Sequence, residues 1–405
     1  MPHKHATILL FAIIIAVICA ILSGWYWGEK MLMFQWVGTL FLNALKMMII
    51  PLIVSAVISG LASFSDMEKL RKLGGITILY YLTTTSIAVL IGLFMVNIIK
   101  PGEGLNFEHT GLDTAIISKK DIGISDIILS MVPQNIFASA VEMKILPIIV
   151  FSIFFSIALI AVGKRAEVVV NFFDALNEIM MKMVIWIMYL APIGIFSLIA
   201  TRLAKSGGGE AFYTEIKAVG LHVVTVLSGL FIHFIFLFLL LLLFTRYGLS
   251  YMFGMLRAIL TAFGTASSSA TLPITMECAR ENNIDERAIR FVLPLGSTVN
   301  MDGTALYEAA AVMFIAQAYG IDMSIGKQAI IFITSTLAAI GAAGIPEAGL
   351  VTMIIVLNAV GLPIEAIGLL LSVDWFLDRF RTSINVWGDS VGAAVVHKYV
   401  ENSSE

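Results

Sequence analysis

The chain carries little charge. Asp, Glu, Lys and Arg make up 13% of its 405 residues, whereas 59% of the residues are hydrophobic and the mean hydropathy is +0.95. So few polar side chains cannot cover a soluble fold, and an integral membrane protein is indicated instead. The net charge of −3 is too small to indicate nucleic acid or another polyion as a partner. The two cysteines, Cys19 and Cys278, lie in apolar segments and suggest neither a disulfide scaffold nor a metal motif.

Long apolar segments fill most of the chain, at about 6–28, 32–65, 75–99, 125–163, 180–201, 217–245, 251–277, 291–320, 328–363 and 364–399. Several exceed the ~20 residues that a helix needs to cross a bilayer, so some must be tilted, broken or folded back. The first has no small-residue cleavage site before Gly24 and the aromatic residues 25–27, and we expect a retained helix. Lys69, Arg71 and Lys72 place the end of the second segment, and with it the N-terminus, in the cytoplasm.

From residue 250 onward, Gly, Pro, Ser, Asn and Asp appear at membrane depth in two similar sets. The first set comprises residues 263–273 and 293–304, and the second comprises residues 341–349 and 385–389. Irregular backbone cannot face lipid, so these breaks must be buried in protein or line a cavity. Interrupted segments at corresponding places in two repeats indicate a transporter's binding site. We predict two re-entrant helical hairpins, whose helix N-termini would attract carboxylates.

One predicted helix, at 374–389, combines three carboxylates with two guanidinium groups. Ionisable groups of both signs inside a bilayer indicate a functional site. At about 100° per residue, one arc of roughly 100° holds six polar residues, with Arg379 outside it: Asp374, Asp378, Arg381, Thr382, Asn385 and Asp389. Arg381 suits a carboxylate and Asp378 suits an ammonium, unless the two form only a structural salt bridge. An acidic amino acid would give each of them a partner.

Hard oxygen ligands recur in the same segments. Asn300, Asp302, Asn385 and Asp389, with the free carbonyls of broken helices, suit Na⁺, whereas Zn²⁺ prefers His or Cys. Capping of the broken helices is the alternative role. Glu308, on an otherwise apolar helix, is a candidate proton carrier or a pairing partner for Arg379. We assign no role to Glu347, and none beyond local structure to Asp374.

The motifs Ser267-Ser268-Ser269, Asn300-Met-Asp-Gly-Thr304, Gly341-Ala-Ala-Gly-Ile-Pro346 and 374–389 resemble the dicarboxylate/amino acid:cation symporter family, which holds the excitatory amino acid transporters of animals and their prokaryotic homologues. The resemblance implies an all-α polytopic membrane protein with eight transmembrane helices, two re-entrant hairpins and inverted repeats. It also implies a homotrimer with an elevator movement. The protein would lie in the plasma membrane, or in the inner membrane of a Gram-negative cell, with both termini in the cytoplasm.

The resemblance divides the chain into a scaffold and a mobile transport domain. Scaffold helices would occupy 1–72 and 101–208, and the transport domain would comprise 73–100 and 209–400. The implied substrate site comprises Ser268, Thr304, Ile345, Gly349, Asp378, Arg381, Thr382 and Asn385. One implied sodium site uses Gly296, Asn300, Asn385 and Asp389, and a second uses Tyr81, Thr84, Thr85, Asn300 and Asp302. A third lies near Thr298, Met301, Ala339, Ile340 and Ala342.

Three positions are more similar to the animal transporters than to the archaeal ones. The archaeal type carries an arginine where this chain has Ala266 and lacks the one at Arg379, and it has glutamine at the position of Glu308. Glu308 and Arg379 therefore imply coupling to protons, with potassium counter-transport as a further option.

We predict a sodium-coupled symporter for glutamate or aspartate, without enzyme activity or an organic cofactor. A proton-coupled C4-dicarboxylate carrier is the first alternative, but its substrate has no ammonium for Asp378. An intramembrane aspartyl protease would also need two aspartates, and a simple channel is a third option. The sequence leaves the choice between aspartate and glutamate open, and also the ion stoichiometry.

Overall fold

The structure, a computed structural model, describes residues 3–62, 71–105, 129, 131–142, 144–205, 210–340 and 348–401. These residues contain helices and no strand. The first half consists of α1 (His3–Trp27), η1 (Gly28–Phe34), α2 (Gln35–Ala62), α3 (Arg71–Ile99), α6 (Ile136–Val141), α7 (Ile145–Val162), η3 (Gly163–Ala166), α8 (Glu167–Met188) and α9 (Ala191–Lys205). The second half consists of α10 (Glu210–Phe244), α11 (Leu249–Thr265), α12 (Ser268–Glu281), α13 (Glu286–Val299), α14 (Asp302–Ala318), α15 (Ile325–Ile340), α16 (Ala348–Val360), η4 (Ile364–Ala366) and α17 (Ile367–Glu401).

Several helices are suited to a bilayer. Within the described residues, four stretches are long and apolar enough to cross a membrane: Phe11–Leu61, Gly74–Ile99, Pro147–Ile187 and Tyr213–Phe244. The first and third of these each run over two helices. Large apolar side chains such as Leu22, Phe94 and Phe231 are exposed on them, as expected of surfaces that face lipid. These features are those of an integral membrane protein.

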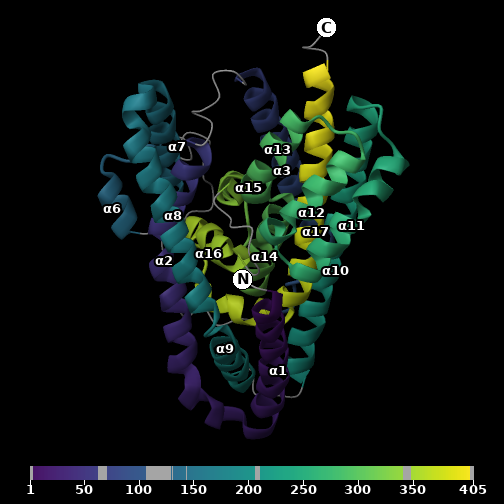
Figure 1. The fold of residues 1–405 in the computed structure, drawn as a ribbon. Helices are drawn as coiled ribbons and strands as arrows, with labels where there is room; N and C mark the ends of the chain where they lie inside the picture. Colours follow the sequence, from purple (N-terminus) through teal and green to yellow (C-terminus); the bar gives the residue numbers. More distant parts are fainter. Residues whose placement is uncertain are drawn as a thin grey trace.

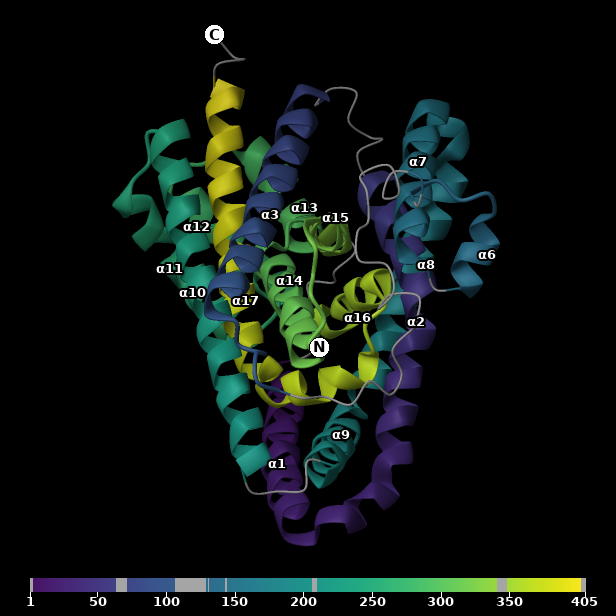
Figure 2. The ribbon, with the colours of Figure 1, turned by 180° about the vertical axis from the view of Figure 1, so that it is seen from behind.

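The helices pack as two groups. The first bundle contains α1, α2, α7, α8 and α9, and the second bundle contains α3 and α10 to α17 (Figures 1 and 2). Close approach within the first bundle depends on small residues, because a Cβ at Gly24 would lie 2.9 Å from the Leu203 Cβ. Contacts between the bundles run mainly from α9 to α17 and from α2 to α16.

Broken helices occur in the second bundle. Helices α11 and α12 pack side by side and are joined at Ala266, whose φ of 49° is left-handed. Ser267 caps α12 by accepting a hydrogen bond from the Ala270 N–H at 3.1 Å. A second break, at Asn300 and Met301, separates α13 from α14. Helices α15 and α16 also pack together, but the residues expected at their tip, 341–347, lie outside the described part of the chain.

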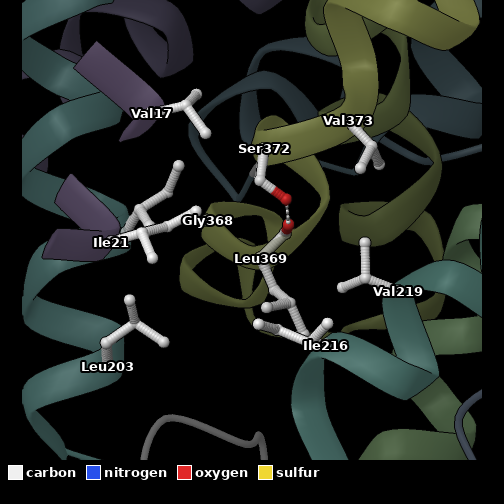
Figure 3. A pocket seen from close by; sticks show the side chains of 10 residues that line it. Val17, Ile21, Leu203, Ile216, Val219, Gly368, Leu369, Ser372 and Val373 are labelled. Carbon is white, nitrogen blue, oxygen red and sulfur yellow. Dashed lines mark hydrogen bonds between the residues drawn. The ribbon is translucent and has the colours of Figure 1, made fainter. Parts of the chain in front are cut away.

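An apolar cavity of about 220 Å³ lies where the two bundles meet (Figure 3). Its lining comes from α1, α9, α10 and the first turns of α17: Val17, Ile21, Ile199, Leu203, Ile216, Val219, Gly368, Leu369, Ser372 and Val373. Ser372 is the polar side chain of this lining, and its hydroxyl donates to the Leu369 carbonyl at 2.7 Å. The cavity therefore offers hydrocarbon walls and no free polar group.

Candidate functional site

Arg381 lies at the centre of the polar face of α17 and is completely buried. Its Nη1 is 2.9 Å from Asp374 Oδ1, and its Nη2 is 2.9 Å from Asp378 Oδ1. The guanidinium carbon also lies 4.1 Å from the centre of the Tyr307 ring, in a cation–π arrangement. The structure thus contains the Asp378–Arg381 pair and gives Asp374, which the sequence left without a role, a position as the second carboxylate partner.

The N-terminal turns of α14 and α16 meet this face of α17, and the N-terminal turn of α12 bonds α13, which packs against α17. Gly349, in the first turn of α16, approaches Arg381 so closely that a Cβ would lie 2.9 Å from Nη1. Ser268, the first residue of α12, donates its hydroxyl to the Ser297 carbonyl at 3.0 Å. In α14, the Gly303 N–H donates to Asn385 Oδ1 at 2.8 Å, and the Asn385 amide donates to the Thr304 hydroxyl at 3.3 Å. N-terminal turns carry positive partial charge, so this arrangement can receive an anionic group.

The remaining predicted substrate residues are Thr382 and Ile345. Thr382 is buried, and its hydroxyl donates to the Asp378 carbonyl one turn earlier, at 2.8 Å. Ile345 lies outside the described residues.

A buried group of oxygen atoms lies between α3, the break before α14, and α17. The Thr85 hydroxyl is 2.7 Å from Asp302 Oδ1, and that of Thr84 is 3.3 Å from the same atom. Both hydroxyls also lie within 3.5 Å of Asn300 Oδ1. The Asn300 amide donates to Asp389 Oδ1 at 3.0 Å, which joins the residues of the first two predicted sodium sites into one network.

Tyr81 occupies a different part of this network from the one expected. Its hydroxyl donates to the Val292 carbonyl at 2.6 Å. A Cβ at Gly296 would lie 2.8 Å from that hydroxyl and 2.3 Å from Asp389 Oδ1. Tyr81 therefore lies with Gly296 and Asp389, and the absence of a side chain at position 296 is what makes room for both.

The residues of the third predicted sodium site are only partly described. Met301 is buried at the break before α14, and Ala339 and Ile340 are buried at the end of α15. The Thr298 side chain is exposed and donates to the Leu295 carbonyl at 3.0 Å, so only its backbone is available to such a site. Ala342 lies outside the described residues.

Glu308 and Arg379 do not form the pair that the sequence allowed. The Arg379 Nη1 donates to the carbonyls of Phe263 and Gly264, both at 2.9 Å, near the turn at Ala266. Glu308 is fully buried on α14, with Thr352 of α16 as its polar neighbour. Arg379 thus fastens the end of α11 to α17, whereas Glu308 faces α16.

Sequence reasoning missed two histidines of α10. His233 is fully buried, and its Nε2 lies 2.9 Å from Asp302 Oδ2. His222, also fully buried, packs its ring 4.9 Å from that of Phe314 and 6.0 Å from that of Tyr307. The sequence contains one signal for them. Two histidines lie inside the apolar segment at 217–245, and ionisable residues in such a segment indicate a functional site.

Comparison with known proteins gives the family of this chain. Residues 9–399 match the sequence profile described as the sodium:dicarboxylate symporter family. The chain belongs to this family. The matched region includes every site residue described above, so the polar face of α17 and the oxygen network lie in the part shared with other sodium:dicarboxylate symporters.

Relatives within the family are similar over most of their length. The chain is 40% identical to an excitatory amino acid transporter of Caenorhabditis elegans, with 89% of the chain and 80% of the relative covered. It is 39% identical to excitatory amino acid transporter 3 of the mouse, with 92% and 80% covered. For human excitatory amino acid transporter 5, the identity is 38%, with 96% and 81% covered.

Proposed function

We propose that this chain is a secondary active symporter that takes up glutamate or aspartate together with sodium. The observation that carries the proposal is the buried Arg381, placed between Asp374 and Asp378 and faced by helix N-termini, beside a buried network of oxygen ligands. The similarity to excitatory amino acid transporters supports the substrate class, and membership of the sodium:dicarboxylate symporter family supports coupling to sodium.

The charges of the site favour an acidic amino acid over a C4-dicarboxylate. Two carboxylates and one guanidinium leave Asp374, Asp378 and Arg381 with a formal charge of −1. An acidic amino acid adds one net negative charge, and its ammonium gives an aspartate a new partner while Arg381 and the helix N-termini take the substrate carboxylates. A dicarboxylate would add two negative charges and leave both aspartates without a new partner.

The oxygen network supports sodium as the coupling ion. Asp302 and Asp389 are buried carboxylates, and a buried charge is stable only with a partner. Hydroxyl, amide and carboxylate oxygens around them are hard ligands suited to Na⁺. Asn385 lies beside this network, because it bonds Gly303 and Thr304, which directly follow Asp302 at the start of α14. A shift of the first turn of α14 would thus reach both sites.

Further features of the proposal come from the family resemblance. They are eight transmembrane helices with two re-entrant hairpins, cytoplasmic termini, a homotrimer surrounded by lipid, and an elevator movement in the plasma or inner membrane. The division into two bundles is consistent with such a movement. Glu308, with Arg379 on the neighbouring helix, is the proposed group for proton co-transport and potassium counter-transport.

Uptake by the purified protein in liposomes tests the proposal, with sodium, proton and potassium gradients imposed one at a time. We expect labelled glutamate or aspartate to accumulate against its gradient when sodium is high outside. Uptake that ignores sodium would contradict the cation assignments, and uptake that ignores pH would remove the role of Glu308. Succinate taken up in preference to both amino acids would favour the dicarboxylate carrier.

A further inference from the structure

His233 contacts the oxygen network from outside it. Its Nε2 lies 2.9 Å from Asp302 Oδ2, and both side chains are fully buried. We propose that His233 is a positioning residue for sodium, which holds the Asp302 carboxylate in the orientation that the cation needs. This inference rests on the sodium coupling proposed above and adds a residue that is hydrogen-bonded to Asp302 and not to Thr84, Thr85 or Asn300.

The two oxygens of Asp302 have different surroundings. Oδ1 accepts the hydroxyls of Thr84 and Thr85 and lies on the side of the predicted sodium ligands. Oδ2 faces His233, and its other side is closed by the backbone of α17, where a Cβ at Gly388 would lie 3.2 Å away. A carboxylate can rotate about its last torsion, so one strong bond to Oδ2 fixes the direction of Oδ1.

The imidazole packs against an aromatic ring of its own helix. Its ring lies 5.7 Å from that of Phe236, at an interplanar angle of 27°. Donation from Nε2 to a carboxylate is a charge-assisted hydrogen bond, which is stronger than a neutral one. An imidazole N–H supplies this donor without a permanent positive charge, whereas Lys or Arg at the same place would repel a cation from Asp302. A histidine therefore suits this position better than a permanent cation.

His222 provides a matched comparison. It lies on the same helix and is equally buried, but its neighbours are the rings of Tyr307 and Phe314 rather than a sodium ligand. A role in packing alone predicts similar consequences for replacing either histidine. A positioning role predicts that only the replacement of His233 changes the response to sodium.

The test is a sodium titration of amino acid uptake by the full-length protein in liposomes, with the variants His233→Leu, His233→Gln and His222→Leu. We expect His233→Leu to raise the half-saturating sodium concentration roughly 10–100-fold, the range known for groups that support metal ligands. His233→Gln keeps an N–H donor and should lie closer to the wild type. His222→Leu should keep the sodium dependence of the wild type.

Thermal melting of each purified variant without substrate, with and without sodium, measures cation binding directly. It also shows whether the variant is folded. A folded His233→Leu with the wild-type response to sodium would overturn the inference. So would an equal shift for His222→Leu, or a His233→Gln that behaves like His233→Leu. A wild type whose uptake and melting both ignore sodium would instead contradict the proposed function itself.

Discussion

At the scale of single residues, the decisive feature is that a fully buried Arg381 is bound by two carboxylates and an aromatic ring. A buried charge that loses its partner is strongly destabilising, so Arg381 and its aspartates depend on one another. Arginine suits this position because its planar guanidinium can pair with two carboxylates at once while the flat face of the group lies on the Tyr307 ring. A substrate carboxylate can then replace one aspartate as the partner of Arg381, while the other aspartate stays paired with the guanidinium.

Arg381→Lys tests this geometry. Lysine keeps the charge but offers neither the fork nor a flat face, so we expect uptake of acidic amino acids at low substrate concentration to fall at least ~30-fold, the equivalent of about 2 kcal/mol. Uptake assays in liposomes measure the loss. Arg257→Lys is the control, because Arg257 is exposed and pairs with Glu277 and Glu281 on the surface. Unchanged uptake by Arg381→Lys would show that the fork is not used.

Much of this residue pattern could be predicted. Helical geometry placed Asp374, Asp378 and Arg381 on one face of one helix, and the structure pairs them there. Asp374 and Arg381 are two turns apart, so the same helical geometry could also have predicted their contact. The sequence argument considered only Asp378, three residues from Arg381, as the partner, and so it left Asp374 without one.

At the scale of elements, the site depends on how closely α14 approaches α17. A Cβ at Gly303 would lie 2.6 Å from the Arg381 carbonyl oxygen and 2.9 Å from its Cα. The Gly303 N–H also holds Asn385. Glycine at this position therefore lets a helix start directly against the backbone that carries Arg381.

Gly303→Ala should separate the two helices. We expect a loss of stability of about 1–3 kcal/mol, as for other overpacked positions, together with weaker binding of both substrate and sodium. Thermal melting and sodium titration measure these effects. Gly220→Ala in α10 is the matched control, since a Cβ there meets nothing within 4 Å and alanine favours a helix. Equal melting temperatures for the two variants would refute the close-packing argument.

Contacts between elements were less predictable than the elements themselves. The sequence argument expected one helix to carry Asn300 and Asp302 after the first broken segment, whereas the structure divides this helix at Asn300 and Met301 into α13 and α14. The pairing of His233 with Asp302 joins residues 69 apart in the chain. Periodicity within one helix carries no information about which distant helix it faces, so neither this contact nor that of Tyr81 with Val292 could be derived from sequence.

At the scale of the whole molecule, the important boundary is the one between the two bundles. Helix α9 meets α17 there, and a Cβ built at Gly368 would lie 3.3 Å from the Leu198 Cβ. This separation is near the range of a disulfide. The chain has only Cys19 and Cys278, so a background without cysteine requires two substitutions.

A disulfide across this boundary should stop transport if the bundles slide past one another. In a background of Cys19→Ser and Cys278→Ala, we expect Leu198→Cys with Gly368→Cys to lose uptake on oxidation and regain it on reduction. The single variants Leu198→Cys and Gly368→Cys cannot form this bond, and each should keep its uptake under the same oxidation. Full uptake with the pair oxidised, verified by mass spectrometry, would argue against an elevator movement.

The apolar cavity at this boundary links the position of the bundles to molecular volume. If lipid and water stay out of it, this cavity of about 220 Å³ adds to the volume of the conformation that contains it. If a shift between the bundles closes it, the two conformations differ in volume, and hydrostatic pressure favours the smaller one. Hydrostatic pressure would then raise the population of the conformation in which the cavity is closed, without any change in the concentration of ions or substrate.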